Sequence, residues 1–260
     1  MNAWSTMLNT LYLHYKVRRL HRLINFFHVL LGIVLVNGWT IDSSEMRITM
    51  DIFVILGVLM YGSLHALNNI ADRQEDKKNK RKAHRIIASG QLSLKELYID
   101  VVACIIISLI LLWNYYPKFL GFALLFIALN ISYSYIVKRF HHVIGTLMMA
   151  WSIPLRLMVG VTVAGGNIGE YWMWYVLVWA GVVMEVSRKI QHEHRRYSGI
   201  MLKTLRVFLL MLFSILAATL LLVGYRVSLL AIYCIYYVGY QVLYFYSPRV
   251  RQLAYFIWTT

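Results

Sequence analysis

The chain has 260 residues, of which 60% are hydrophobic and only 14% are charged, and its formal net charge is +15. A soluble domain is closer to half apolar and carries about a quarter charged residues. This composition therefore excludes an ordinary soluble domain and indicates a lipid environment. The two cysteines, Cys104 and Cys234, both lie in apolar runs. They are interpreted as small core residues, because two thiols so placed support neither a disulfide nor a zinc site.

Eight apolar runs have roughly the 20-residue length that a helix needs to cross a bilayer. The first run follows a basic and aromatic segment and lacks a small-residue cleavage site, so it is interpreted as a span rather than a signal peptide. The tail after Pro248 is too short to cross a full bilayer and is expected to form a partial ninth helix or an interfacial one. The predicted fold is an all-α polytopic transmembrane bundle of eight to nine helices, with residues 1–260 in a single domain. The eight runs lie at 23–39, 52–71, 97–113, 119–137, 143–164, 171–187, 207–224 and 227–246.

The basic residues predict how the chain is oriented in the membrane. Lysines and arginines precede the first span, follow Pro248 and fill the loops after the second, fourth and sixth spans; the exceptions are Arg47, Lys118, Arg156 and Arg226. Positive residues favour the cytoplasmic side. We therefore expect an integral, multi-pass protein whose two termini and three basic loops face the cytoplasm if eight spans are present. A surface for nucleic acid would not alternate with span number, so no nucleic-acid partner is expected.

The most informative polar segment lies at the cytoplasmic end of the second predicted span. Asn68, Asp72 and Asp76 are spaced by four residues, so on a helix they lie along one face. Oxygen ligands of this kind suit Mg²⁺, which commonly binds through one or two carboxylates together with substrate phosphates. A basic run that includes Lys82 and Arg85 follows at once. Together with a metal ion these cations would bind a diphosphate; the alternative is a solvated loop of mixed charge.

Four short segments, taken in order, carry a resemblance to a known family. The segment Asn68-Asn69-x-x-Asp72-x-x-x-Asp76, followed by Arg81-Lys82-Ala-His84-Arg85, resembles the first aspartate-rich motif of the UbiA-type intramembrane prenyltransferases. The resemblance covers most of the chain, and the order of the segments and their placement by span support it. The other three are Arg22-Leu-Ile-Asn25, similar to the Arg-Pro-x-Asn of that family's first helix; Tyr133-Ser-Tyr135-Ile-Val-Lys138, similar to its Tyr-x-x-Lys segment; and Arg156-Leu-Met-Val-Gly160, similar to the arginine-glycine pair of its fifth helix.

The resemblance implies roles for residues near the cytoplasmic ends of the spans. Lys138 would reach a phosphate bound beside Asp72 and Asp76, although a lysine that only anchors a span at the interface is the alternative. Tyr135 would orient that lysine or the leaving group, and an interfacial belt tyrosine is its alternative. The expected metal ligands are Asn68, Asp72 and Asp76; the expected diphosphate-binding residues are Asn25, Lys82, Arg85, Lys138, Arg188 and Lys189; and the expected catalytic residues are Lys138, Tyr135, Glu185 and Arg156.

Arg156 follows Pro154 well inside a predicted span. An arginine at such a depth costs several kcal/mol, on the order of 2.5–3.5 on insertion scales, unless it is paired or faces a wet cavity. A functional role near Asp72 or a substrate anion is therefore expected, and structural pairing with Glu185 is the alternative.

The second polar loop departs from the family, which usually carries a second aspartate series there. The stretch from Glu185 to Arg196 has no aspartate. Glu185 is a candidate metal ligand or substrate-orienting base, and Arg188 and Lys189 are candidates to hold a diphosphate arm directly. His192-Glu193-His194 does not predict a zinc site, because two histidines two residues apart do not share a helix face.

The expected function is Mg²⁺-dependent transfer of a prenyl group from an allylic diphosphate to a small acceptor within the membrane, with the active site at the cytoplasmic face. Two alternatives stay open: related superfamily chemistry, meaning phosphoribosyl transfer to a polyprenyl phosphate or terpene cyclisation, and a non-catalytic membrane binding or transport protein. The expected partners are a prenyl diphosphate donor, a small acceptor and the lipid bilayer. The sequence predicts neither the acceptor, the prenyl chain length nor the oligomeric state.

Overall fold

The computed structural model describes residues 3–79, 82–137, 142–193, 200–239 and 247. Throughout these residues the regular structure is helical and no strand occurs, which confirms the all-α prediction. The chain forms two compact units: the first comprises Met1–Leu30 and Ile41–His141, and the second comprises Leu31–Thr40 and His142–Thr260. Each unit is described by itself, and the expectation of a single domain over residues 1–260 stays a prediction.

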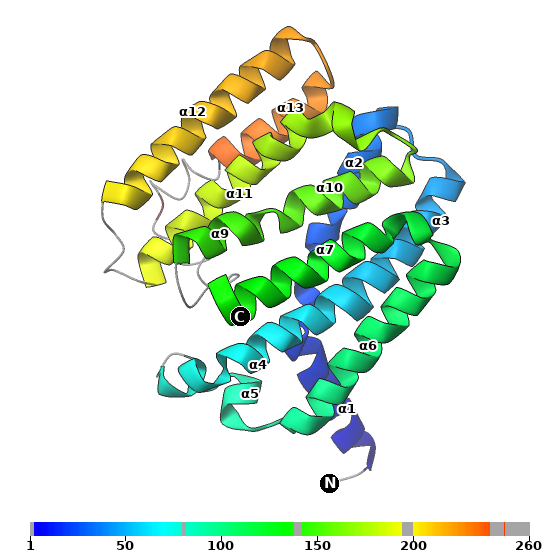
Figure 1. Cartoon of the computed structure of the whole chain (residues 1–260), viewed down its shortest axis with the longest axis vertical. Coiled ribbons are helices and arrows are strands. Elements are labelled where there is room, and N and C mark those ends of the chain that lie inside the picture. The colour runs from blue at the N-terminus through cyan, green and yellow to red at the C-terminus, as the bar shows by residue number, and fades with distance from the viewer. Residues whose placement is uncertain (1–2, 80–81, 138–141, 194–199, 240–246, 248–260) are drawn as a thin grey trace. The chain divides into compact units, whose positions relative to one another are not determined.

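The first unit is built around three apolar helical segments that pack side by side, α4, α6 and α7 (Figure 1). A short helix, α5, follows the end of α4, and the N-terminal helix α1 contacts both of them. A buried apolar cluster that includes Val17, Ala66, Ile87 and Leu97 joins these parts. The elements are α1 (Ala3–Val17), η1 (Leu20–Phe26), α3 (Ser43–Ile52), the π-helical η2 (Phe53–Tyr61), α4 (Gly62–Lys78), α5 (Ile86–Ser89), α6 (Leu94–Tyr115), η3 (Pro117–Phe119), α7 (Leu120–Ile131) and the π-helical η4 (Ser132–Val137).

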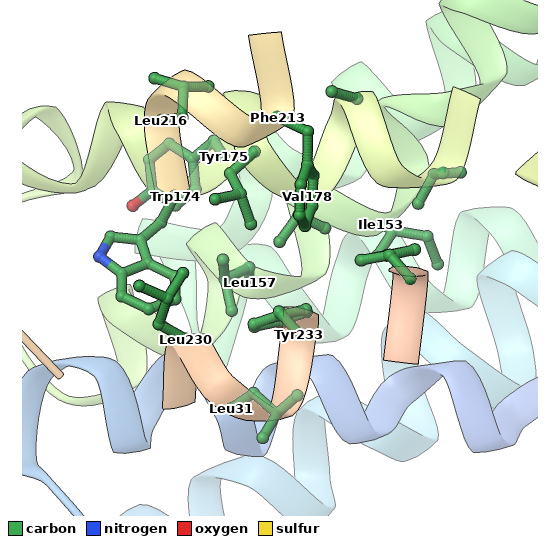
Figure 2. Close-up of a cluster of buried hydrophobic side chains, with 14 of the residues drawn as sticks. Leu31, Ile153, Leu157, Trp174, Tyr175, Val178, Phe213, Leu216, Leu230 and Tyr233 are labelled. Carbon is green, nitrogen blue, oxygen red and sulfur yellow. The ribbon is translucent and has the colours of Figure 1, made fainter. Parts of the chain in front are cut away.

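The second unit is organised around α11, which packs against α9, α10 and α12 (Figure 1). Its core is aromatic: Trp174, Tyr233 and Phe213 are buried together with Leu157 and Val178 (Figure 2). The elements are the later part of α2 (Phe27–Asn37), α9 (His142–Ala150), α10 (Ser152–Val163), η5 (Ile168–Tyr171), α11 (Trp172–Glu193), α12 (Ile200–Leu222), α13 (Val227–Cys234) and the π-helical η7 (Ile235–Gly239).

Within the described residues, five helical stretches are long and apolar enough to cross a membrane. They match the second, third, fourth, fifth and seventh predicted spans. The first and eighth predicted spans correspond to shorter apolar helices, Phe27–Asn37 and Val227–Gly239, and the sixth, apart from its first residue, lies within the 22 residues of α11. Large apolar side chains such as Ile106 and Ile110 on α6 are exposed, as expected of a surface that faces lipid. The chain is therefore an integral membrane protein. The five stretches are Ser43–Lys78, Leu94–Tyr115, Pro117–Val137, Val143–Val163 and Thr204–Leu222.

Close backbone contact between α2 and α10 depends on glycine. A Cβ added at Gly32 would lie 2.2 Å from the carbonyl oxygen of Leu157 and 2.8 Å from the Cα of Gly160. Small residues let helix backbones approach in this way in membranes. The sequence has glycine at position 32, where any side chain would force the two helices apart.

We predict that Gly32→Ala lowers the unfolding temperature in detergent, because overpacking a close contact costs typically about 1–3 kcal/mol. Gly121→Ala is the matched control, since nothing lies within 4 Å of a Cβ added at Gly121. That substitution is expected to leave the unfolding temperature equal or slightly higher, because alanine favours helix more than glycine does. Equal unfolding temperatures for both variants, in thermal scans at one heating rate, would show that the contact between α2 and α10 is not tight.

Candidate active site at the end of α4

The predicted helix that carries the acidic motif is present. α4 runs over Gly62–Lys78 and therefore contains Asn68, Asp72 and Asp76 in one continuous α-helix. Residues four apart on an α-helix follow one face. The three oxygen-bearing side chains thus lie along the same side of α4. Their role as metal ligands stays a prediction.

Asp76 is the buried member of this set, with only 5% of its surface exposed. Arg85 Nη1 donates a hydrogen bond to Asp76 Oδ2 at 2.9 Å, which is also an ion pair. The chain returns to α4 through a turn in which the N–H groups of Lys82 and Ala83 donate to the Asn79 carbonyl at 2.8 and 2.9 Å. This turn brings a cation of the basic loop against the last acid of the motif, and it carries Lys82, which is half-buried, beside them.

Asn68 is held from the neighbouring segment η4. The hydroxyl of Ser134, which is buried, donates to Asn68 Oδ1 at 3.0 Å. A carbonyl oxygen has two lone pairs, so Asn68 Oδ1 can accept this bond and still offer its second lone pair to a ligand. The contact orients the amide oxygen. Ser134 was missed by the sequence prediction, although it lies between Tyr133 and Tyr135 of a segment that the prediction singled out.

Tyr135 follows Ser134 on the same π-helical segment. Its hydroxyl lies 3.4 Å from the hydroxyl of Tyr98 on α6. π-Helical segments often occur at functional sites, and two of them adjoin the motif: η2 runs directly into α4, and η4 carries Ser134 and Tyr135. Lys138, the partner predicted for Tyr135, lies outside the described residues.

Asn25 lies in η1 of the first unit, and this short helix packs against η2. Its own carbonyl oxygen is 2.9 Å from His28 Nδ1. Within unit 1 the structure thus pairs Asn68 with Ser134 and, two turns further along α4, Asp76 with Arg85, whereas the predicted role of Asn25 rests on its position in η1.

The remaining predicted residues belong to the second unit. Arg156 on α10 is fully buried, and its Nη1 donates to the carbonyl oxygen of Ser152 at 2.9 Å. Glu185 on α11 is 7% exposed. Arg188 and Lys189 follow on the last turns of the same helix, and their side chains lie outside the description. Burial of Arg156 agrees with the depth predicted from the sequence, and its place in the site stays a prediction.

A second polar contact holds the residue next to Asn68. Arg19 Nη2 donates to Asn69 Oδ1 at 3.1 Å, and Asn69 Nδ2 donates to the carbonyl oxygen of Val17 at 2.9 Å. The sequence offered a weak signal for this contact: an amide inside an apolar helix needs a polar partner. Arg19 was interpreted only as part of the orientation signal.

The oxygen ligands on α4 fit a Mg²⁺ ion that is coordinated only partly by the protein. Among the described residues, no group of three or more His, Cys, Asp or Glu side chains is arranged to hold a metal ion, so these residues do not form a closed metal cage. Oxygen ligands one helical turn apart, Asp72 with either Asn68 or Asp76, instead suit an ion that completes its octahedron with substrate phosphates and water. Arg85 contacts Asp76 through Oδ2, so a metal ion at Asp76 would share that carboxylate with the arginine.

We predict that Arg85→Ala lowers the unfolding temperature by several degrees. The reason is that Asp76 would be left buried without its partner, at a cost of about 1–3 kcal/mol. The double variant Asp76→Asn/Arg85→Met should regain most of the loss, because no uncompensated charge is left. Lys78→Ala, which removes an exposed charge from the last turn of α4, is the control for a change in net charge. Equal losses for Arg85→Ala and Lys78→Ala would contradict a stabilising ion pair.

Comparison with known proteins identifies the family to which this chain is similar. Residues 25–259 match the model of the UbiA prenyltransferase family. A 4-hydroxybenzoate octaprenyltransferase from Alkalilimnicola ehrlichii is 32% identical over 146 residues, which are 54% of this chain and 48% of that protein. A protoheme IX farnesyltransferase from Baumannia cicadellinicola is 39% identical over 95 residues, which are 34% of this chain and 33% of that protein. The matched regions thus span between a third and a half of these relatives.

A solved structure, from a study of digeranylgeranylglyceryl phosphate synthase in membranes, superimposes with a TM-score of 0.71 at 16% identity. The alignment covers 96% of this chain and 93% of that chain. At this identity the likeness concerns the fold, and it confirms the predicted UbiA-like helical architecture. Since the family model covers nearly the whole sequence, the chain belongs to the UbiA prenyltransferase family.

Proposed function

We propose that this protein is an intramembrane prenyltransferase that uses Mg²⁺ to transfer a prenyl group from an allylic diphosphate to a small acceptor. The observation that carries the proposal is the polar face of α4, where Asn68, Asp72 and Asp76 follow one another beside Arg85, in a chain of this family. Both matched relatives are named as prenyltransferases.

Asn68, Asp72 and Asp76 would hold the metal ion in this proposal. When bound, Mg²⁺ neutralises the charge that develops on a departing diphosphate. The contact from Ser134 keeps the Asn68 oxygen in a fixed orientation, and Arg85 keeps the Asp76 carboxylate in one position. Preorganised groups of this kind stabilise a transition state without reorganising during the reaction.

The cations of the loop after α4 would bind the diphosphate itself. Lys82 and Arg85 lie on the turn that returns to Asp76, and Lys138, which follows η4 in the sequence, is assigned the same role. Asn25 on η1 would contribute a polar contact. An arginine or lysine beside a phosphate makes a charge-assisted hydrogen bond, which is roughly twice as strong as a neutral one.

Four residues of the second unit are assigned roles from the sequence resemblance. Arg188 and Lys189 are assigned to the diphosphate, replacing the second aspartate series of the family, and Arg156 to a substrate anion. Glu185 would act as a metal ligand or as the base that orients the acceptor. Its burial in an apolar helix supports a functional role, because buried carboxylates are rare without one.

The proposed reaction moves the prenyl group from the diphosphate to the acceptor. The bond between C1 of the prenyl group and the diphosphate oxygen breaks, and its electron pair leaves with the diphosphate. A nucleophilic atom of the acceptor then forms a bond to C1 and loses a proton to a base. Tyr135, through its hydroxyl, would orient the leaving group or Lys138. The names of the two relatives specify different acceptors, and the acceptor in this proposal is a small nucleophilic molecule.

The proposed active site faces the cytoplasm. The loop after α4 contains most of the basic residues near the motif, and positive residues favour the cytoplasmic side. The α4 motif, Lys82 and Arg85 all lie at this end of the stretch Ser43–Lys78. Both termini would then be cytoplasmic in a bundle of eight spans.

We predict that Asp72→Asn abolishes the release of pyrophosphate from labelled prenyl diphosphates, because the neutral amide binds Mg²⁺ far more weakly than a carboxylate does. Glu75→Gln is the matched control: Glu75 lies on the same helix, is exposed, and its neutralisation changes the net charge equally. The assay uses purified protein with Mg²⁺ or with EDTA. An unchanged rate in Asp72→Asn, or full activity in EDTA, would contradict the proposed metal role.

A second prediction concerns Glu185→Gln, which keeps the size of the side chain and removes its charge. If Glu185 is a ligand or base, the rate should fall at least about tenfold, equivalent to about 1.4 kcal/mol of barrier. Circular dichroism and the unfolding temperature check that the variant is folded. A rate within about twofold of the unmodified protein would exclude Glu185 from the mechanism.

A further inference from the structure

The N-terminal helix α1 has an exposed apolar stripe that no part of the proposed function uses. α1 covers Ala3–Val17 and thus precedes residue 25, where the match to the family begins. Six large side chains on it are exposed, and they recur at steps of three and four residues, so they share one helix face. They are Trp4, Met7, Leu8, Leu11, Tyr12 and Tyr15.

The other sides of α1 have different surroundings. Val17 is buried in the apolar cluster that it forms with residues of α4, α5 and α6, and Leu13 is half-buried on the same side. Asn9 and Lys16 are exposed and lie on a third side of the helix. Toward its end α1 therefore has one side on the protein, beside a polar side and the apolar stripe.

Contacts at the end of α1 place the helix near the end of a membrane span. Arg18 Nη2 donates to Asp100 Oδ2 at 2.6 Å, and His14 Nδ1 is 3.4 Å from the same oxygen. Asp100 is six residues after the start of α6, or about 9 Å along a helix. α1 also contacts α5, in the connection between the spanning stretches Ser43–Lys78 and Leu94–Tyr115. These contacts put α1 at the level where α6 enters the bilayer.

The described residues of α1 do not reach across a bilayer. Its 15 residues extend about 22 Å, whereas the hydrocarbon core is about 30 Å thick. The composition instead matches a helix that lies in the interface: two tyrosines and a tryptophan are on the apolar side, and such residues are enriched at the level of the headgroups.

The charge of this region fits an anionic lipid surface. The first acidic residue of the chain is Asp42, whereas Lys16, Arg18 and Arg19 cluster at the end of α1. The Lys16 ammonium lies 4.6 Å from the centre of the Tyr12 ring. Burial lowers the pKa of Arg18, but its hydrogen bonds to Asp100 and Cys104 raise the pKa above the usual value. Arg18 therefore keeps its charge, and each basic residue near an anionic leaflet adds about 1 kcal/mol of attraction.

The helix that α1 contacts has its own lipid-facing surface. Ile99 and Val102 of α6 are exposed on either side of Asp100 in sequence, and the same helix exposes Ile106 and Ile110 further along. Helix α6 is one of the stretches long and apolar enough to span. α1 is thus attached at the start of the exposed apolar surface of α6.

We propose that α1 is an interfacial lipid-binding helix, with its apolar stripe in the boundary between headgroups and acyl chains and with Asn9 and Lys16 toward water. Its occupant is the phospholipid surface around unit 1. The Arg18–Asp100 ion pair and the Arg19–Asn69 hydrogen bond fasten the helix to α6 and α4. The bond to Asn69 ties the membrane-bound helix to the residue next to Asn68.

Spin labels on the full chain test this proposal. In a Cys104→Ser/Cys234→Ser background, the variants Leu8→Cys and Leu11→Cys place a nitroxide on the stripe, and Asn9→Cys places one on the polar side as the matched control. The proteins are measured in nanodiscs of phosphatidylcholine with a quarter phosphatidylglycerol. Oxygen, which concentrates in lipid, and a nickel chelate, which stays in water, report the environment of each label.

The expected result is that the ratio of oxygen to nickel accessibility is severalfold higher at positions 8 and 11 than at position 9. Equal access of nickel to all three labels would overturn the proposal, because the stripe would then face water. Access of neither reagent to positions 8 and 11 would also overturn it and would indicate contact with a second copy of the chain. Unfolding temperatures equal to that of the background protein confirm that the labelled variants are folded.

A charge substitution provides an independent readout. Leu11→Glu in the Leu8→Cys protein is expected to raise nickel access to the label severalfold, because a carboxylate on the stripe opposes insertion into lipid. Leu13→Met, on the protein-facing side, is the control for a change within α1 that leaves the stripe intact. An unchanged accessibility ratio in Leu11→Glu would overturn the proposal.

Discussion

The ion pair between Asp76 and Arg85 is the constraint on which the α4 site depends. Asp76 is buried at the end of a helix that emerges from a membrane-spanning stretch, and a buried carboxylate without a partner is expensive. Arg85 supplies the partner only because the chain turns back through the Asn79 carbonyl. That turn gives the basic loop a fixed position beside the acidic motif. The pairing therefore places a cation of the basic loop against an acid of the motif, as the proposed site for a metal ion and a diphosphate requires.

A polar site at the end of an apolar helix needs support from its neighbours. Ser134 orients Asn68, and Arg19 satisfies Asn69. Both contacts link α4 to segments distant in sequence, η4 and the end of α1. Rigid support of this kind keeps reacting groups in a productive geometry. If α1 lies in the membrane interface as proposed, the bilayer itself contributes to the position of α4.

Much of the fold follows from the sequence by simple physical rules. Apolar runs of membrane length predict spans but not the exact ends of the helices. In the stretch Ser43–Lys78, α3, η2 and α4 join into one helical stretch that is longer than the apolar run at 52–71. The capping box of Asp42 and Glu45 begins this stretch and is visible in the sequence as an acid followed three residues later by glutamate. The helical spacing of Asn68, Asp72 and Asp76 was equally readable.

The sequence alone does not predict which side chains contact each other across the fold. The Asp76–Arg85 pair is local, and both residues were named, but their mutual contact depends on a turn whose geometry has no simple signature. Ser134 on Asn68 and Arg18 on Asp100 join residues 66 and 82 positions apart. Such pairings are set by helix packing, which residue spacing within one helix cannot specify. The sequence signal for such a contact was an acid, Asp100, inside an apolar run, because a buried acid needs a polar partner.

The most direct test of the central claim is a titration of Mn²⁺, as a spectroscopic substitute for Mg²⁺, followed by EPR with and without an unreactive prenyl diphosphate analogue. Because α4 offers two carboxylates and one amide oxygen, the account predicts strong binding only when the analogue supplies further oxygen ligands. It also predicts that the bound signal is absent in Asp72→Asn. Equally strong binding without the analogue, or a bound signal that persists in Asp72→Asn, would contradict the account.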